Sequence, residues 1–220
     1  MGQDIKLTAS DNFQLGAYRA DPTGAPKAAV VVIQEIFGVN SHIRDVTDRF
    51  AQAGYTAIAP ALFDHEKKNV ELNYDEVGMK TGIELVSKLG FDKPIQDVEA
   101  AAKRIAIAGK VGTVGFCWGG SVAYLSAIKL GLPGVSYYGG RNIMFVDQKA
   151  KAPLLFHYGE RDAHISADDR AKVQAANPDA GFYVYDADHG FNCDQRGSYD
   201  APSAKLAMER TLAFFEKNLA

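Results

Sequence analysis

A cysteine between two glycines is the side chain best placed for nucleophilic chemistry. The chain reads Gly-Phe-Cys-Trp-Gly from Gly115 to Gly119, with Cys117 at the centre. The apolar run Val111–Phe116 predicts a buried strand before it, and Ser121–Leu130 has helical spacing after it. G-x-S-x-G turns present a serine nucleophile between a strand and a helix, and their glycines let neighbouring backbones approach. We therefore expect Cys117 at a strained turn and a helix N-terminus, where a thiolate is favoured.

An acid and a histidine follow two later strands. Asp162 comes after the expected strand Pro153–Tyr158, and His189 comes after the expected strand Phe182–Tyr185. The order Cys117, Asp162, His189 is the nucleophile–acid–histidine order of α/β hydrolases. A thiol needs a base to become a good nucleophile at neutral pH, because the ordinary pKa of cysteine is near 8.5. The histidine can take the proton, and the acid can orient the histidine.

Each of these residues also has a structural interpretation. Cys117 can be a buried thiol or form a disulfide with Cys193, Asp162 can cap the residues from Ala163 onward, and His189 can be a structural loop histidine. The placement of all three after successive strands favours catalysis.

Glu35 directly follows Gln34, the end of another apolar strand, so we expect it at the same edge of the sheet. A surface charge is the alternative. Its neighbours Ile36 and Phe37 indicate a poorly solvated carboxyl group, which can exchange a proton with Cys117. The loop from Ile36 also stands where this fold supplies one oxyanion-hole N–H, and the residue after the nucleophile, Trp118, supplies the other.

The elements around these residues alternate between strands and helices. Further strands are expected at Phe13–Ala20 (an antiparallel edge strand), Ala28–Ile33, Tyr55–Ala59 and Val135–Tyr138, and helices at His42–Ala53, Tyr74–Leu89, Ile95–Ala108, Ser166–Ala176 and Ala201–Leu219. This order predicts an α/β fold with a mainly parallel central sheet and helices on both faces.

Composition limits the class of protein. The chain has 220 residues, 47% of them hydrophobic, and we expect one α/β domain over residues 1–220. The net charge of -3 and the absence of a Lys/Arg-rich run argue against nucleic acid as a partner. Two cysteines suit a reducing compartment, residues 1–8 lack a signal-peptide pattern, and no apolar run approaches the ~20 residues that span a bilayer. These features favour a cytoplasmic protein without a membrane partner. We also expect a monomer.

The chain resembles the dienelactone hydrolase (carboxymethylenebutenolidase) family of the α/β-hydrolase fold over nearly its whole length. The matching stretches are Gln34–Gly38, Ile43–Asp45, Gly115–Gly120, Gly159–Ala163 and His189–Phe191, with a similar tail from Arg196 to Phe215. The resemblance implies a thiol-based hydrolase of lactones or esters that needs neither a metal nor an organic cofactor. It assigns Cys117 as nucleophile, His189 as base, Asp162 as orienting acid, Glu35 as modulator of the thiol, and the N–H groups of Ile36 and Trp118 as the oxyanion hole.

The substrate contacts depart from the family pattern. Chlorocatechol-pathway members hold the dienelactone carboxylate with arginines, one shortly after the catalytic histidine. Here Cys193 stands four residues after His189, the next arginine is Arg196, and Lys80 stands near the other expected position. Arg196 and Lys80 are therefore candidate carboxylate contacts, and Phe37 a candidate apolar contact. Arg196 can instead pair with Glu35 or the C-terminal helix.

We expect hydrolysis of a small-molecule lactone or carboxylic ester through a cysteine acyl-enzyme. One alternative is a broader carboxylesterase or thioesterase with the same triad. The other is a non-catalytic binding or redox-sensing protein that uses Cys117 and Cys193.

Overall fold

The computed structural model describes residues 2–220, which cluster into two compact units. The first unit extends to Thr113 and includes Leu219 and Ala220, and the second is Val114–Asn218. Each is described by itself below.

The first unit contains a four-stranded mixed sheet in the order β1-β2-β4-β3. Its strands are β1 (Gln3–Thr8), β2 (Gln14–Ala20), β3 (Ala28–Ile33) and β4 (Tyr55–Pro60). The pairs β1–β2 and β2–β4 are antiparallel, and β3–β4 is parallel. All residues of β3 and β4 are buried, as is typical of parallel strands covered on both faces.

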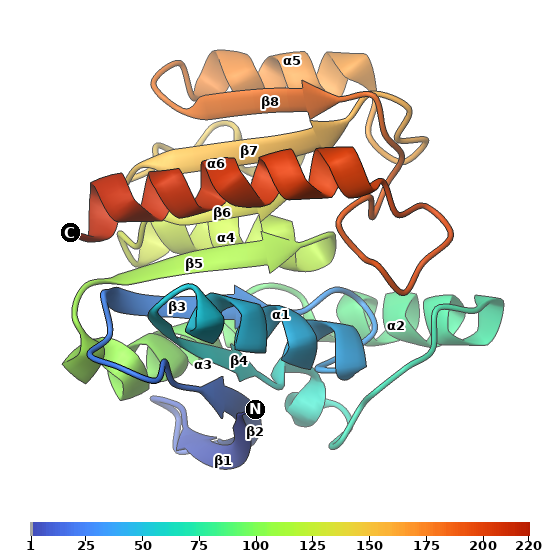
Figure 1. The fold of residues 1–220 in the computed structure, drawn as a ribbon. Helices are drawn as coiled ribbons and strands as arrows, with labels where there is room; N and C mark the ends of the chain where they lie inside the picture. Colours follow the sequence, from blue (N-terminus) through green and yellow to red (C-terminus); the bar gives the residue numbers. More distant parts are fainter. Residues whose placement is uncertain (1) are drawn as a thin grey trace. The chain divides into compact units, whose positions relative to one another are not determined.

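Helices cover both faces of this sheet. Helix α1 (Ser41–Gln52) lies in front of β3 and β4 in Figure 1, and α3 (Asp92–Ile105) lies behind them. Asn40 caps α1, because its side-chain oxygen accepts a hydrogen bond from the N–H of Ile43 at 3.2 Å. Helix α2 (Glu76–Leu89) and the short helices η1 (Leu62–His65) and η2 (Ala106–Ala108) complete the unit.

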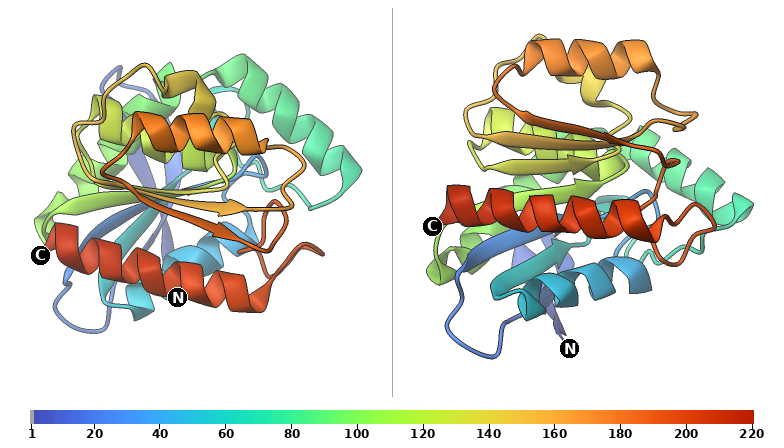
Figure 2. Two further views of the ribbon diagram at one scale, coloured as in Figure 1. Left: turned by 90° about the horizontal axis from the view of Figure 1, so that it is seen from above. Right: turned by 45° about the horizontal axis from the view of Figure 1, so that its top comes forward.

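The strand order in the second unit is β5-β6-β7-β8, and the pairs β6–β7 and β7–β8 are parallel. Strand β5 (Val111–Phe116) enters it from the boundary, and β6 (Gly134–Tyr137), β7 (Leu154–Gly159) and β8 (Gly181–Tyr185) follow. The helices are α4 (Trp118–Lys129), η3 (Asn142–Phe145), α5 (Ala167–Ala176) and α6 (Ala201–Leu219). Figure 2 shows α5 and α6 on opposite sides of β7 and β8.

The α/β class, the mainly parallel strands and the helices on both faces are confirmed. The placement of Phe13–Ala20 at the sheet edge is wrong, because Gln3–Thr8 forms β1 and pairs with its outer side. Strand β1 is mostly exposed, and sequence reasoning did not identify its short period-two pattern, in which Ile5 and Leu7 alternate with polar residues. Helix α3 begins earlier than expected, at Asp92, with Pro94 in its first turn, a position that tolerates proline.

The assignment of residues 1–220 to one domain stays a prediction. In the described residues, no helix is both long and apolar enough to cross a membrane.

A buried polar network joins α6 to the strands of the second unit. His157 on β7 is fully buried, with Nδ1 2.8 Å from the hydroxyl of Tyr185 and Nε2 3.1 Å from that of Thr211. Thr211 also lies 2.7 Å from the hydroxyl of Tyr137 on β6. Burial, with a smaller effect of the Arg210 charge, lowers the pKa of His157 to about 3. The network therefore contains a neutral histidine at physiological pH.

Acid is expected to destabilise the protein through His157. The pKa of His157 in the folded protein is about 3, below the ordinary value of 6.5. Between pH 6.5 and about pH 3, His157 is therefore protonated in the unfolded chain and neutral in the folded protein. Within that window the free energy of unfolding should lose about 1.4 kcal/mol per pH unit through this group. Urea unfolding between pH 7 and pH 4 measures the slope, which His157→Gln should reduce. An equal slope in both proteins would contradict the assignment.

Candidate active site

The turn that carries Cys117 has the strained geometry expected of a nucleophile elbow. Cys117 has φ 56° and ψ -121° at the N-cap of α4, directly after β5. A side chain at Gly115 would overlap the backbone of Gly119, so the close approach of strand and helix requires glycine there. The Cys117 N–H donates to the carbonyl of Tyr137 at 3.0 Å, which ties the turn to β6. The positive φ of a non-glycine residue costs about 1–3 kcal/mol and is a mark of functional sites.

His189 and Asp162 lie together in the same unit. Nδ1 of His189 is 2.7 Å from Oδ2 of Asp162, and the Asp162 side chain is completely buried. The other carboxylate oxygen accepts a hydrogen bond from the N–H of His164 at 2.8 Å. Asp162 thus caps its loop and also contacts the histidine, and its catalytic role stays a prediction.

Cys117 interacts with His189 by a hydrogen bond and by charge. Burial alone lowers the pKa of His189, but the charge of Cys117 and the hydrogen bonds with Asp162 and Cys117 outweigh it and raise the pKa to about 10. The opposite charges of a thiolate and an imidazolium stabilise each other. This arrangement brings a thiol and an imidazole into direct interaction.

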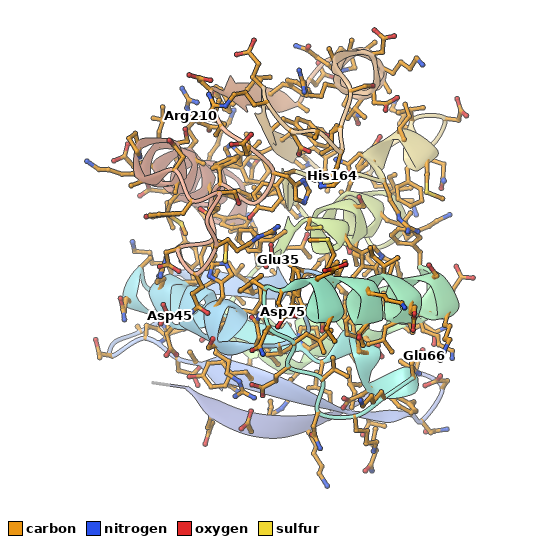
Figure 3. All side chains as sticks on the ribbon, turned by 90° about the vertical axis from the view of Figure 1, so that its right-hand side faces the viewer. Glu35, Asp45, Glu66, Asp75, His164 and Arg210 are labelled. Atoms are coloured by element: carbon orange, nitrogen blue, oxygen red, sulfur yellow. The ribbon has the colours of Figure 1, made fainter. Side chains whose placement is uncertain are left out.

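Two aromatic rings flank His189 that sequence reasoning did not identify. The ring of Tyr138 lies 5.0 Å from that of His189, and Tyr138 has φ 38° directly after β6. The ring of His164 lies 5.2 Å away at an interplanar angle of 83°. Figure 3 looks onto the carboxyl ends of the strands and labels His164 there. Tyr138 is the last residue of the strand predicted at Val135–Tyr138. Its position at a strand end could have identified it as a neighbour of the candidate site.

The other candidate residues of the second unit are accounted for individually. Trp118 is buried at the first position of α4. Both Cys117 and Cys193 are free thiols, so the disulfide alternative is wrong. The guanidinium of Arg196 lies against Gly190, since a side chain at Gly190 would meet its Nη1 at 2.7 Å. Arg196 is therefore next in space to the residue that follows His189.

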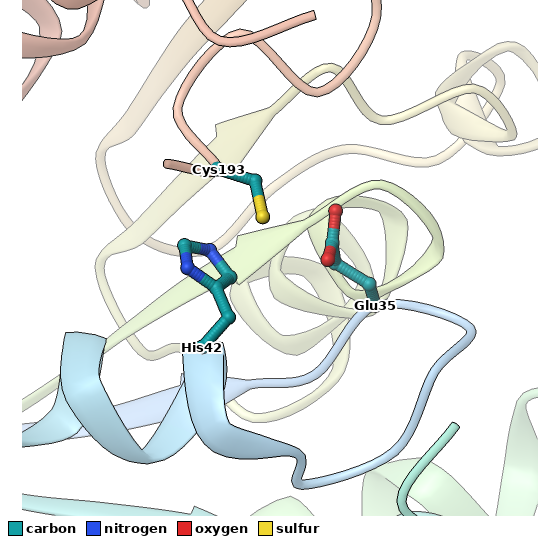
Figure 4. Close-up of side chains that lie close together, drawn as sticks. All are labelled: Glu35, His42 and Cys193. Atoms are coloured by element: carbon teal, nitrogen blue, oxygen red, sulfur yellow. The ribbon is translucent and has the colours of Figure 1, made fainter. Parts of the chain in front are cut away.

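Glu35, Ile36, Phe37 and Lys80 belong to the first unit. Glu35 and Phe37 follow β3 and are buried, with 0% and 1% of their surface exposed. Figure 4 draws Glu35 beside His42 of α1, and a ring nitrogen of His42 lies within 4.8 Å of a Glu35 carboxylate oxygen. The surface-charge interpretation of Glu35 is therefore wrong. Lys80 is exposed on α2, and its contact with a substrate stays a prediction.

A groove in the second unit lies away from His189. Its volume is about 1050 Å³, and it is lined by the starts of β7 and β8 and the end of α6, including Arg210 and Lys217. Cys117, Asp162 and His189 instead follow the carboxyl ends of strands, so this groove is not the candidate active site.

The mainly parallel sheet and the strained turn at Cys117 together define the α/β-hydrolase fold. Comparison with known proteins identifies the family within this fold. A model of the dienelactone hydrolase family matches residues 15–219, and the chain therefore belongs to that family.

Proteins that are similar to this chain over nearly its whole length carry names of the same family. A candidate carboxymethylenebutenolidase from Synechocystis is 35% identical, and the match covers 100% of this chain and 100% of that protein. Carboxymethylenebutenolidase from Pseudomonas putida is 32% identical over 96% of this chain and 95% of its own. Among solved structures, a candidate dienelactone hydrolase from Klebsiella pneumoniae is 36% identical with a TM-score of 0.81, covering 97% of this chain and 98% of its own. The protein is a hydrolase that acts on a lactone or ester.

Proposed function

We propose that this enzyme cleaves a dienelactone-like lactone or carboxylic ester through an acyl-enzyme on Cys117. The observation that carries the proposal is the contact of His189 with both the buried Asp162 and the elbow cysteine. The thiolate attacks the carbonyl carbon, and the N–H groups of Ile36 and Trp118 stabilise the tetrahedral oxyanion. The imidazolium of His189 donates its proton to the leaving oxygen as the acyl bond breaks.

Water completes the reaction. His189, now neutral, takes a proton from a water molecule, which attacks the thioester carbonyl. The second tetrahedral intermediate expels the Cys117 thiolate and releases the carboxylic acid. In a lactone the leaving oxygen stays tethered to the acyl group, so one product forms. Glu35 serves as the acid–base modulator of Cys117.

We further propose that the whole chain is one domain, and that the protein is monomeric and cytoplasmic.

Recognition of the substrate carboxylate rests on Arg196 and Lys80. Arg196 is supported by its position against Gly190, next to the histidine. Arg196 lies beyond the arginine position of the chlorocatechol-pathway enzymes, and Lys80 stands near the other position without being an arginine. Uncharged esters and thioesters are therefore the second candidate substrates.

Dienelactone and the purified, reduced enzyme test the proposal. We expect rapid loss of the ultraviolet absorbance of dienelactone, and an acyl adduct on the Cys117 peptide after an acid quench. No loss of dienelactone but turnover of uncharged esters would support the broader esterase. Reversible oxidation of the thiols without turnover of any ester would overturn the proposal in favour of a redox sensor.

A further inference from the structure

Residues 70–82, called here the strap, run along the loop that carries Glu35 in the first unit. The N–H of Leu72 donates to the carbonyl of Phe37 at 2.8 Å, and Gly38 forms an isolated antiparallel bridge with Glu71. Gly38 has φ 83°, and a side chain there would overlap the carbonyl of Val70. The two backbones are therefore in direct contact over several residues.

The end of the strap fixes the same loop from another direction. Gly82 lies on α2, and a side chain at this position would overlap the carbonyl of Ile36. Asp75 caps α2 by accepting a hydrogen bond from the N–H of Gly78 at 2.7 Å. The start of α2 is thus held in place, and Tyr74 immediately precedes this cap.

Tyr74 reaches from the strap to the buried acid. Its hydroxyl donates to Oε2 of Glu35 at 2.8 Å. Its ring packs on that of Phe37, with centroids 4.5 Å apart, and lies 6.4 Å from the ring of His42. Since these contacts hold the ring, the hydroxyl meets the carboxylate in a defined orientation.

We propose that Tyr74 is a positioning residue that fixes the orientation of the Glu35 carboxylate and thereby sets the reactivity of the Cys117 thiol. This inference rests on the proposed function, in which Glu35 modulates the thiol. The side chain of a buried glutamate can adopt several rotamers, and a hydrogen bond from a fixed donor stabilises one of them. The strap carries no catalytic group itself and acts through Glu35.

Tyr74→Phe tests the proposal, because it removes the hydroxyl and keeps the ring against Phe37. Hydrogen bonds to charged groups are strong, so kcat should fall about tenfold with KM changed less than about twofold. Tyr199→Phe, an equal change at a 42% exposed tyrosine, is the control and should leave kcat unaltered. An unchanged urea midpoint would show that Tyr74→Phe folds normally.

A double-mutant cycle separates positioning from a general structural effect. If Tyr74 acts through Glu35, adding Tyr74→Phe to Glu35→Gln should cost no more than about twofold in kcat. A full tenfold loss in that background, or no loss in the single variant, would overturn the proposal.

Alkylation of Cys117 by iodoacetamide supplies a readout that needs no substrate. The rate constant, measured on the Cys117 peptide, should change about tenfold in the same direction in Tyr74→Phe and in Glu35→Gln, and no further in the double variant. This pattern without ester turnover would refute the proposed function while supporting the inference. Equal alkylation rates in all four proteins would refute the inference whatever the turnover.

Discussion

Replacing Cys117 by alanine is expected to lower kcat by a factor on the order of 10⁴ or more, to the limit of detection. No other free thiol of the described residues can replace it at the elbow, because Cys193, the second cysteine, is completely buried elsewhere in the chain. Without the sulfur no thioester forms, and the two-step path is lost. The residual rate reflects binding and oxyanion stabilisation alone.

The same substitution should change the charge of His189. The negative charge of Cys117 contributes to raising the pKa of this histidine to about 10, against the opposing effect of burial. In Cys117→Ala that contribution disappears, so the pKa of His189 should fall. Cys117→Ser keeps the size of the side chain, and since its hydroxyl stays neutral, the same fall is expected.

Two measurements check this prediction. Turnover is followed with dienelactone or with whichever ester the wild type cleaves, and the His189 ring is titrated by NMR in all three proteins. Thermal unfolding shows whether the variants fold. Wild-type turnover in Cys117→Ala would eliminate the nucleophile assignment, and an unaltered His189 titration would eliminate the thiolate–imidazolium pair.

The chemistry-bearing residues were predictable because strand ends and glycine patterns are local signals. The elbow requires Gly115 for a backbone approach that no side chain permits, so its sequence pattern directly reflects its geometry. Asp162 follows the buried strand β7 and His189 follows the partly exposed edge strand β8. Parallel strands place their carboxyl ends at one edge. The function followed from the order of these residues together with the family resemblance.

Other features depend on packing that no short pattern encodes. Strand β1 has only two apolar residues, Ile5 and Leu7, and is mostly exposed, so its pairing with the edge of β2 is what stabilises it. Tyr74 begins the helix expected at Tyr74–Leu89, but α2 starts only at Glu76, so Tyr74 lies just before it. Its hydrogen bond to Glu35 joins residues 39 positions apart. The neutral state of His157 depends on complete burial under α6, which composition cannot reveal.

Asp162→Asn is expected to lower kcat on the order of 10³–10⁴-fold, although the amide has nearly the shape of the carboxylate. Asp162 accepts two hydrogen bonds, from Nδ1 of His189 at 2.7 Å and from the N–H of His164 at 2.8 Å. An amide has one oxygen and one NH₂ group. If its oxygen faces the N–H of His164, its NH₂ faces Nδ1 of His189, which then carries its proton on Nε2 and cannot accept one from the thiol.

The opposite amide orientation fails for another reason. The oxygen then accepts from His189, but the NH₂ group opposes the N–H of His164, and a buried donor is left without an acceptor at a cost of about 1–3 kcal/mol. Either orientation also removes the negative charge that helps to raise the pKa of His189. The imidazolium should therefore lose its proton at lower pH, and the alkaline limb of kcat/KM should move to lower pH.

Asp188→Asn is the matched control, because it removes an exposed carboxylate one residue before His189. Its kcat should stay within about twofold of the wild type, since an exposed charge is screened by solvent. The pH profile of kcat/KM is measured for both variants, and their unfolding midpoints are compared. A similar loss in both would mean that net charge near His189 matters, whereas a loss confined to Asp162→Asn requires the buried hydrogen bond. If Asp162→Asn keeps wild-type kcat, then Asp162 serves only to cap its loop, and the histidine is oriented by its aromatic neighbours Tyr138 and His164.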